Sequence, residues 1–288
     1  MAGEGNARSE GTPMKLVVRS VVDAASVNIV EHLLRMGEWR QEGDFEGAPV
    51  HRMGDAAIVS IPVHHLYYDG IDEKVEKALG ERPALVAFAS RHKSASNMRT
   101  LTIHPIGNYA KAEMGGKERT LVPSAPHEMT AALRWLKKNA SMLPFQVSFE
   151  ATHHGPSLGA PTFYIEIGSD EQAWKSPEAG KAAAAALHEV LTCDVPENPV
   201  ALGIGGGHYM PRITDVALEK SVSFGHMLPS YQLEEGVRSH MLESMVGATN
   251  GAEMVYFHRK AIKTPVLREL TDWFRARGIR PVSSKDLA

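Results

Sequence analysis

The sequence predicts an α/β fold, a single domain with a mixed, mostly parallel central sheet flanked by helices. Strand-like and helix-like segments alternate along nearly the whole chain, which is typical of parallel strands joined by crossover helices. The chain has 288 residues, of which 43% are hydrophobic, enough for one large core. No internal repeat or clear linker divides it. These observations favour one continuous domain.

The first elements follow from short apolar runs. Residues 15–20 are strand-like, and residues 25–36 have apolar side chains at helical spacing up to Gly37, a typical helix end. Two buried strands are expected at 56–61 and 84–89, with a helix at 72–79 between them. Residues 90–126 lack a clear period and contain several glycines, so we expect a long functional loop.

The second half continues the alternation. The alanine-rich residues 179–191 form a strong helix candidate, and residues 200–204 are β-branched or small and lead into three glycines. The other expected strands are 145–149, 162–167 and 253–257, and the other expected helices are 127–139, 215–220, 233–244 and 265–277.

Composition limits the class of protein. Residues 1–13 are polar, without the basic and apolar segments of a secretory signal, so we expect a disordered tail before a domain spanning 14–288. No run of about 18 apolar residues is present, so no membrane partner is expected. Cys193, the only cysteine, is expected to be a small core residue in a reducing cytoplasm. A net charge of −3 restricts nucleic-acid binding to a local patch.

Two segments that follow predicted strands carry residues suited to chemistry. They read EATHHGP (150–156) and GIGGGHYMP (203–211). Ligands in open α/β sheets gather where loops converge at strand ends, so we expect an active site at that edge. Imidazoles act as general bases near neutral pH. The candidate catalytic residues are His154, His153, His208, Glu150 and His104.

Backbone amides and basic side chains supply the candidate binding groups. The triple glycine could stabilise an oxyanion or cradle a phosphate, but it matches neither a Walker loop nor GxGxxG, so a nucleotide cofactor is not expected. The candidate substrate-binding residues are Arg91, His92, Lys93, Gly205, Gly206, Gly207 and Asn108. The candidate metal ligands are His153, His154 and His208, although no HExxH or paired CxxC is present. Glu166 either orients a histidine, binds a metal or has a structural role.

Several motifs in one order resemble the archaeal and plant type of D-aminoacyl-tRNA deacylase. They are AFASRHKS (87–94), TIHPIGN (102–108), FEATHHGP (149–156), FYIEIGS (163–169), ALGIGGGHYMPR (201–212) and FGHMLP (224–229). The resemblance implies hydrolysis of the ester between a D-amino acid and the terminal ribose of tRNA, extending to aldehyde-modified forms. It also implies a zinc cofactor and a fold similar to peptidyl-tRNA hydrolase and phosphorylase-like proteins. The partner would be D-aminoacyl-tRNA, not DNA, and we expect a cytoplasmic monomer.

A mechanism can be outlined from these residues. We hypothesise that His154 or His208 activates water or orients the terminal hydroxyl of tRNA, while amides near Gly206 and Gly207 receive the carbonyl oxygen. L-aminoacyl esters would be rejected sterically. Two alternatives stay open at this point: a zinc-dependent hydrolase of a small ester, amide or peptide, and a non-catalytic module that binds the tRNA acceptor end.

Overall fold

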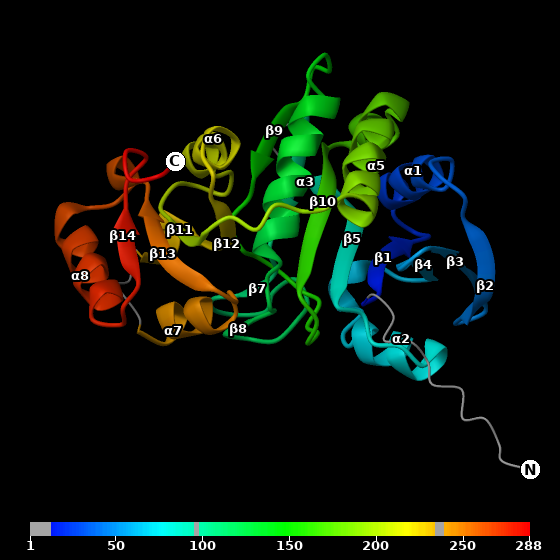
Figure 1. Cartoon of the computed structure of the whole chain (residues 1–288), viewed down its shortest axis with the longest axis horizontal. Coiled ribbons are helices and arrows are strands. Elements are labelled where there is room, and N and C mark those ends of the chain that lie inside the picture. The colour runs from blue at the N-terminus through cyan, green and yellow to red at the C-terminus, as the bar shows by residue number, and fades with distance from the viewer. Residues whose placement is uncertain (1–12, 95–97, 234–238) are drawn as a thin grey trace, which may run out of the picture.

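The computed structural model describes residues 13–94, 98–233 and 239–288, and it is an α/β fold (Figure 1). The larger sheet has eight strands in the order β2-β3-β4-β1-β5-β10-β6-β9. They are β1 (Lys15–Ser20), β2 (Arg40–Phe45), β3 (Ala48–Met53), β4 (Ala56–Ile61), β5 (Leu85–Lys93), β6 (Thr100–His104), β9 (Gln146–Phe149) and β10 (Thr162–Ser169). The strands β4, β1, β5 and β10 are parallel, whereas β10 pairs antiparallel with β6.

Helices cover both faces of this sheet. The helices are α1 (Ala24–Leu33), α2 (Ile71–Leu79), α3 (Pro126–Asn139), α4 (Glu171–Trp174), α5 (Pro177–Thr192), α6 (Pro211–Glu219), α7 (Ser239–Gly247) and α8 (Thr264–Arg275). Because side chains alternate along a strand, Ala87 and Ile165 face the core shared with α1, α3 and α5, while Phe88 and Tyr164 face the core shared with α2. Figure 1 shows α2 on the opposite side of the sheet from α1 and α5.

A second, smaller sheet lies at one end of the molecule (Figure 1). Its four parallel strands, in the order β12-β11-β13-β14, are β11 (Val200–Ile204), β12 (Ser223–Leu228), β13 (Ala252–Phe257) and β14 (Arg280–Val282). Leu202, Val255 and Phe274 belong to the core that this sheet shares with α7 and α8. The predicted mostly parallel α/β class is therefore confirmed, but the described strands divide between two main sheets and one separate two-stranded pair.

Two stretches differ from the sequence expectations. Residues 90–126 are not one irregular loop, because β5 continues to Lys93 and β6 lies within them, with the short pair β7 (Gly107–Asn108) and β8 (Thr120–Leu121) beyond. The hairpin of β2 and β3 was not expected, since five of the six residues of β2 are exposed and polar or glycine and provide no apolar signal. Cys193 is exposed rather than part of the core.

The N-terminal tail expected over residues 1–13 lies outside the described residues except for Pro13. None of the helices in the described part of the chain is both long and apolar enough to cross a membrane.

Candidate active site

Part of the site lies on one face of the larger sheet. His92 lies four residues after Phe88 on β5, and Glu166 lies two residues after Tyr164 on β10, so each pair lies on the same face of the sheet. The antiparallel register sets Tyr164 opposite His104 on β6, so all three polar side chains share this face. The apolar core with α2 thus changes into a polar cluster toward one end of the sheet. We expected the site at strand ends, and His104 is the last residue of β6 and His92 the last but one of β5, whereas Glu166 lies within β10.

The rest of the site comes from two segments, one after β9 of the larger sheet and one after β11 of the smaller sheet. After β9, the backbone pairs with the loop after β11: Ala151 N–H donates to the His208 carbonyl at 2.8 Å, and Met210 N–H donates to the Phe149 carbonyl at 3.0 Å. An isolated bridge also links Glu150 with Tyr209. These bonds hold Glu150 and His208 side by side although 58 positions separate them in the sequence.

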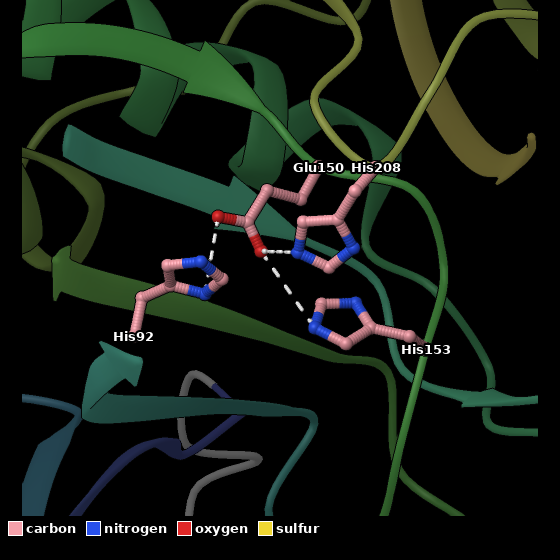
Figure 2. Close-up of side chains that lie close together, drawn as sticks. All are labelled: His92, Glu150, His153 and His208. Carbon is pink, nitrogen blue, oxygen red and sulfur yellow. Dashed lines mark ion pairs between the residues drawn. The ribbon is translucent and has the colours of Figure 1, made fainter. Parts of the chain in front are cut away.

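The Glu150 carboxylate is the centre of the cluster. Figure 2 shows it between the imidazoles of His92, His153 and His208. Its Oε1 lies 3.4 Å from His92 Nδ1, and its Oε2 lies 3.2 Å from His208 Nε2 and 3.6 Å from His153 Nε2. Neither carboxylate oxygen has a hydrogen-bond partner among the described residues, nor does His208 Nε2, and all three atoms are buried. Buried polar atoms without partners are costly, which indicates that a ligand belongs here.

A second carboxylate, that of Glu166, contacts two histidines of the cluster. Glu166 Oε2 lies 3.4 Å from His92 Nδ1 and 3.5 Å from His104 Nε2. Burial raises the pKa of Glu166, but its contacts with His104 and His92 outweigh burial and lower the pKa. Burial lowers the pKa of His92, yet the contact with Glu166 and the charges of Glu150 and Glu166 raise it to about 9. At neutral pH the His92 imidazole therefore carries a proton on each nitrogen in the metal-free protein.

Backbone carbonyls fix the protons of the two adjacent histidines. His153 Nδ1 lies 2.7 Å from the Ala151 carbonyl, and His154 Nδ1 lies 2.7 Å from the Gly155 carbonyl. A carbonyl only accepts, so both Nδ1 atoms carry hydrogen and both Nε2 atoms expose lone pairs in the neutral rings. Burial and neighbouring histidines hold the pKa of His153 well below its usual value and lower that of His154 to about 3.

This arrangement suits a metal ion. His153 Nε2 and Glu150 Oε2 both expose lone pairs and face each other, so they repel unless a cation lies between them. Ligand atoms of a tetrahedral zinc, each about 2.0–2.1 Å from the ion, lie about 3.3–3.4 Å apart, close to the separations around Glu150. Histidine ligands also donate their second N–H to a carbonyl or carboxylate, as His153 does to Ala151. Potential ligand atoms of His92, Glu150, His153 and His208 lie within 4.8 Å of one another.

A cavity of about 580 Å³ opens onto the cluster. His92, His153, His154, Glu166 and His208 line its base together with Tyr209, whose hydroxyl lies 3.2 Å from His92 Nε2. Arg91, Lys93, Met114 and Tyr67 also line the cavity, and Tyr67 is 66% exposed. The size is that of a small-molecule pocket, enough for an amino acid and part of a nucleoside.

The structure brings together most, but not all, of the residues predicted for the site. Gly205, Gly206, Gly207 and Asn108 do not line the cavity. The N–H groups of Gly205 and Gly206 already donate to the Leu228 carbonyl and Ser230 Oγ, which leaves them unavailable to an oxyanion. Asn108 donates its amide to the carbonyls of Gly115 and Lys117 and so holds a loop.

Two residues of the site were missed or undervalued. Tyr209 follows His208 directly and received no role, and Glu166 was not assigned to the catalytic set. The alternation of Leu101 and Ile103 with polar residues would have indicated β6 and its polar face.

Comparison with known proteins decides the family. A family model described as D-aminoacyl-tRNA deacylase matches residues 79–282, which include every residue of the cluster. The chain belongs to this family. Proteins named D-aminoacyl-tRNA deacylase from Methanosarcina mazei and Pyrococcus horikoshii are each 37% identical to it, over 94% and 96% of this chain and 92% and 96% of the relatives.

A solved structure agrees with the fold of this deacylase family member. A crystal structure described as a conserved protein of unknown function superposes with a TM-score of 0.88 at 30% identity, covering 96% of this chain and 97% of the other. Both sheets therefore occur together in a relative.

Proposed function

We propose that this protein hydrolyses the ester of D-aminoacyl-tRNA, releasing free tRNA and the D-amino acid. Near full-length similarity to proteins named for this reaction carries the proposal. The polar cluster at the base of a nucleoside-sized cavity supplies groups suited to ester hydrolysis. The family match makes the zinc hydrolase of small substrates and the non-catalytic module the less favoured alternatives. Clearance of aldehyde-modified substrates, a cytoplasmic location and a monomeric state stay predictions.

We also propose that Glu150, His153 and His208 hold a zinc ion. The unpartnered oxygens of Glu150 and the lone pair on His153 Nε2 support this ligand set, which matches the two-histidine, one-glutamate sets of zinc hydrolases. When bound, zinc would polarise the ester carbonyl and lower the pKa of a water molecule. His92 would stay outside the ligand set, because Glu166 and Tyr209 already engage its two nitrogens.

The leaving ribose oxygen needs a proton as the ester bond breaks. Tyr209 lines the cavity, and its hydroxyl can donate this proton while His92 Nε2–H replaces it through their 3.2 Å contact. Glu166 holds His92 in position from the other side of the ring. His154 is a poor general base at neutral pH because its pKa lies near 3, so its role is to shape the wall of the pocket.

The outer part of the cavity would hold the terminal nucleotide. The Arg91 guanidinium lies over the Trp174 ring, 5.0 Å from its centroid, and contacts His64 Nε2 at 3.4 Å, which fixes it toward an incoming phosphate. Lys93 adds a second positive charge. The exposed Tyr67 ring offers a surface on which the terminal adenine can stack. Fixing the nucleoside in this way would direct the side chain of an L-amino acid into the wall.

The test compares D-tyrosyl-tRNA with a small D-tyrosine ester in the purified protein. We expect hydrolysis of the tRNA substrate, with a KM that rises steeply with ionic strength because phosphate contacts release counterions. A protein that hydrolyses the small ester equally well, without salt dependence on either substrate, would be a small-substrate hydrolase instead.

A further inference from the structure

A second cavity, of about 550 Å³, lies in the smaller sheet and is strongly basic. The strands β11, β13 and β14 are parallel, so the segments after their carboxyl ends meet at one edge. His258, Arg259 and Lys260 follow β13, and Lys285 follows β14 after two serines. Arg212 joins them from the start of α6. We call the cavity lined by Arg212, Arg259, Lys260 and Lys285 the basic cleft.

The positive charge of the basic cleft is only partly offset by a nearby carboxylate. None of its four cations forms an ion pair with a carboxylate among the residues that the structure describes. Asp286 lies nearby, and its Oδ2 accepts hydrogen bonds of 2.7 Å from both the N–H and the hydroxyl of Ser283. These bonds lower the pKa of Asp286, and the charges of Arg280 and Arg259 lower it further, but within the described residues Asp286 makes no ion pair with Arg259. Burial lowers the pKa of His258, and the charges of Arg212 and Lys260 lower it further. Such a local excess of charge in a protein of net charge −3 indicates an anionic ligand.

One cation of the cleft is oriented in advance. Arg212 Nε donates to the Tyr256 hydroxyl at 3.0 Å, and its Nη2 donates to Ser284 Oγ at 2.7 Å. These bonds fix the guanidinium and leave its remaining N–H groups for a ligand. Arg259, Lys260 and Lys285 are exposed and make no side-chain hydrogen bond within the described residues. This pattern of one fixed arginine and three adaptable cations is suited to a chain of phosphates.

The basic cleft lies next to the catalytic cluster. Arg212 follows His208 by four residues, so their Cα atoms are within about 15 Å of each other. Between the two sites runs the glycine loop: a Cβ on Gly206 would lie 3.6 Å from His258 Nδ1, and one on Gly205 would lie 3.1 Å from the His258 carbonyl. Both glycines have positive φ, +101° and +108°, which L side chains rarely adopt. The two glycines therefore allow this loop to pack closely against the segment after β13.

We propose that the basic cleft binds backbone phosphates of the tRNA acceptor arm while the terminal aminoacyl-adenosine occupies the catalytic cavity. The inference rests on the proposed function, because that function supplies a polyanion whose end lies at His208. A run of phosphates matches four cations spread over three segments better than a single small anion does. The basic cleft would account for tRNA binding by a protein with an acidic overall charge.

The experiment measures the Kd of uncharged tRNA at several salt concentrations. The test variant is R259Q/K260Q/K285Q, and the matched control K137Q/K138Q/K181Q removes three other exposed positive charges from α3 and α5. We expect the test variant to raise the Kd roughly tenfold or more and to reduce the slope of log Kd against log salt by about 2 to 3. The control should change the Kd less than about twofold. A second measurement follows hydrolysis of D-tyrosyl-adenosine, which has no phosphate and should be cleaved equally by both variants.

Three results would overturn the proposal. The first is an equal Kd for tRNA in the test variant and the control. The second is an equal loss of activity on D-tyrosyl-adenosine and on D-tyrosyl-tRNA, which would show that the variant disturbs the catalytic cavity. The third is weaker binding of inorganic pyrophosphate with an unchanged Kd for tRNA, which would make the cleft a small-anion site. Wild-type protein that binds tRNA through the cleft but hydrolyses neither substrate would contradict the proposed function and still support the role of the cleft in tRNA binding.

Discussion

Replacing Glu150 with glutamine removes one charge and preserves the shape of the side chain at the centre of the cluster. The wild-type carboxylate is fully buried, and neither oxygen has a hydrogen-bond partner among the described residues. The amide of a glutamine can donate to the lone pair of His153 Nε2, so the metal-free variant should be at least as stable as the metal-free wild type. Zinc at 100 times its Kd should stabilise the wild type by about 2.7 kcal/mol. For a domain of this size, that free energy corresponds to a Tm increase of roughly 4–5 °C, which E150Q should lack.

The assay combines metal content, thermal unfolding with and without zinc, and single-turnover hydrolysis of D-tyrosyl-tRNA. Replacing an outer-shell partner of a metal typically costs 10- to 100-fold, so loss of a ligand should slow hydrolysis more than about 100-fold. Glu219→Gln is the control, because it makes the same chemical change at an exposed residue without a side-chain hydrogen bond or ion pair in the described part of the protein. An E150Q protein that retains zinc, or that reacts within threefold of wild type, would refute the reasoning.

Three further predictions concern separate parts of the molecule. Tyr209→Phe removes the hydroxyl beside His92 and should lower kcat about 100-fold with little change in KM; an unchanged kcat in steady-state assays would exclude it as the acid. Tyr67→Ala should raise the KM for D-tyrosyl-tRNA roughly 5- to 150-fold, because base stacking contributes about 1–3 kcal/mol, and a KM within twofold would rule out stacking there. Burial lowers the pKa of His226 to about 4 in the folded protein, so proton uptake by the unfolded chain, with a pKa near 6.5, lowers stability as pH falls from 6.5 toward 4. The free energy of unfolding, measured with urea, decreases from pH 8 to pH 5, and His226→Gln should make this decrease about 2 kcal/mol smaller. An unaltered pH dependence would contradict the assigned pKa.

Periodicity and composition are sufficient to predict the fold class but not the division into two sheets. Largely buried strands such as β1, β4 and β11 and the alanine-rich α5 were predicted within a few residues. The hairpin of β2 and β3 was not predicted because β2, at the edge of the sheet, has five exposed residues out of six and no apolar pattern. The strand β6 was missed although its apolar and polar residues alternate, with the polar ones facing the site.

The histidines of the site and Glu150 were among the predicted residues, whereas Tyr209 received no role and Glu166 was left with several alternatives. His153 and His208 stand in motifs that are unusual for packing, and the structure places both against Glu150. The role of Glu166 depends on the register that sets β10 between β5 and β6, which a single sequence does not reveal. The glycine loop was assigned to oxyanion binding, but the N–H of Gly206 is taken up by Ser230.

Single-turnover hydrolysis of D-tyrosyl-tRNA and L-tyrosyl-tRNA by the same zinc-loaded sample tests the central claim most directly. The account predicts rapid release of D-tyrosine and a rate for the L-ester at least about 100-fold lower, the size expected when a wall excludes a side chain. Equal rates for both enantiomers, or no release of either amino acid, would contradict it.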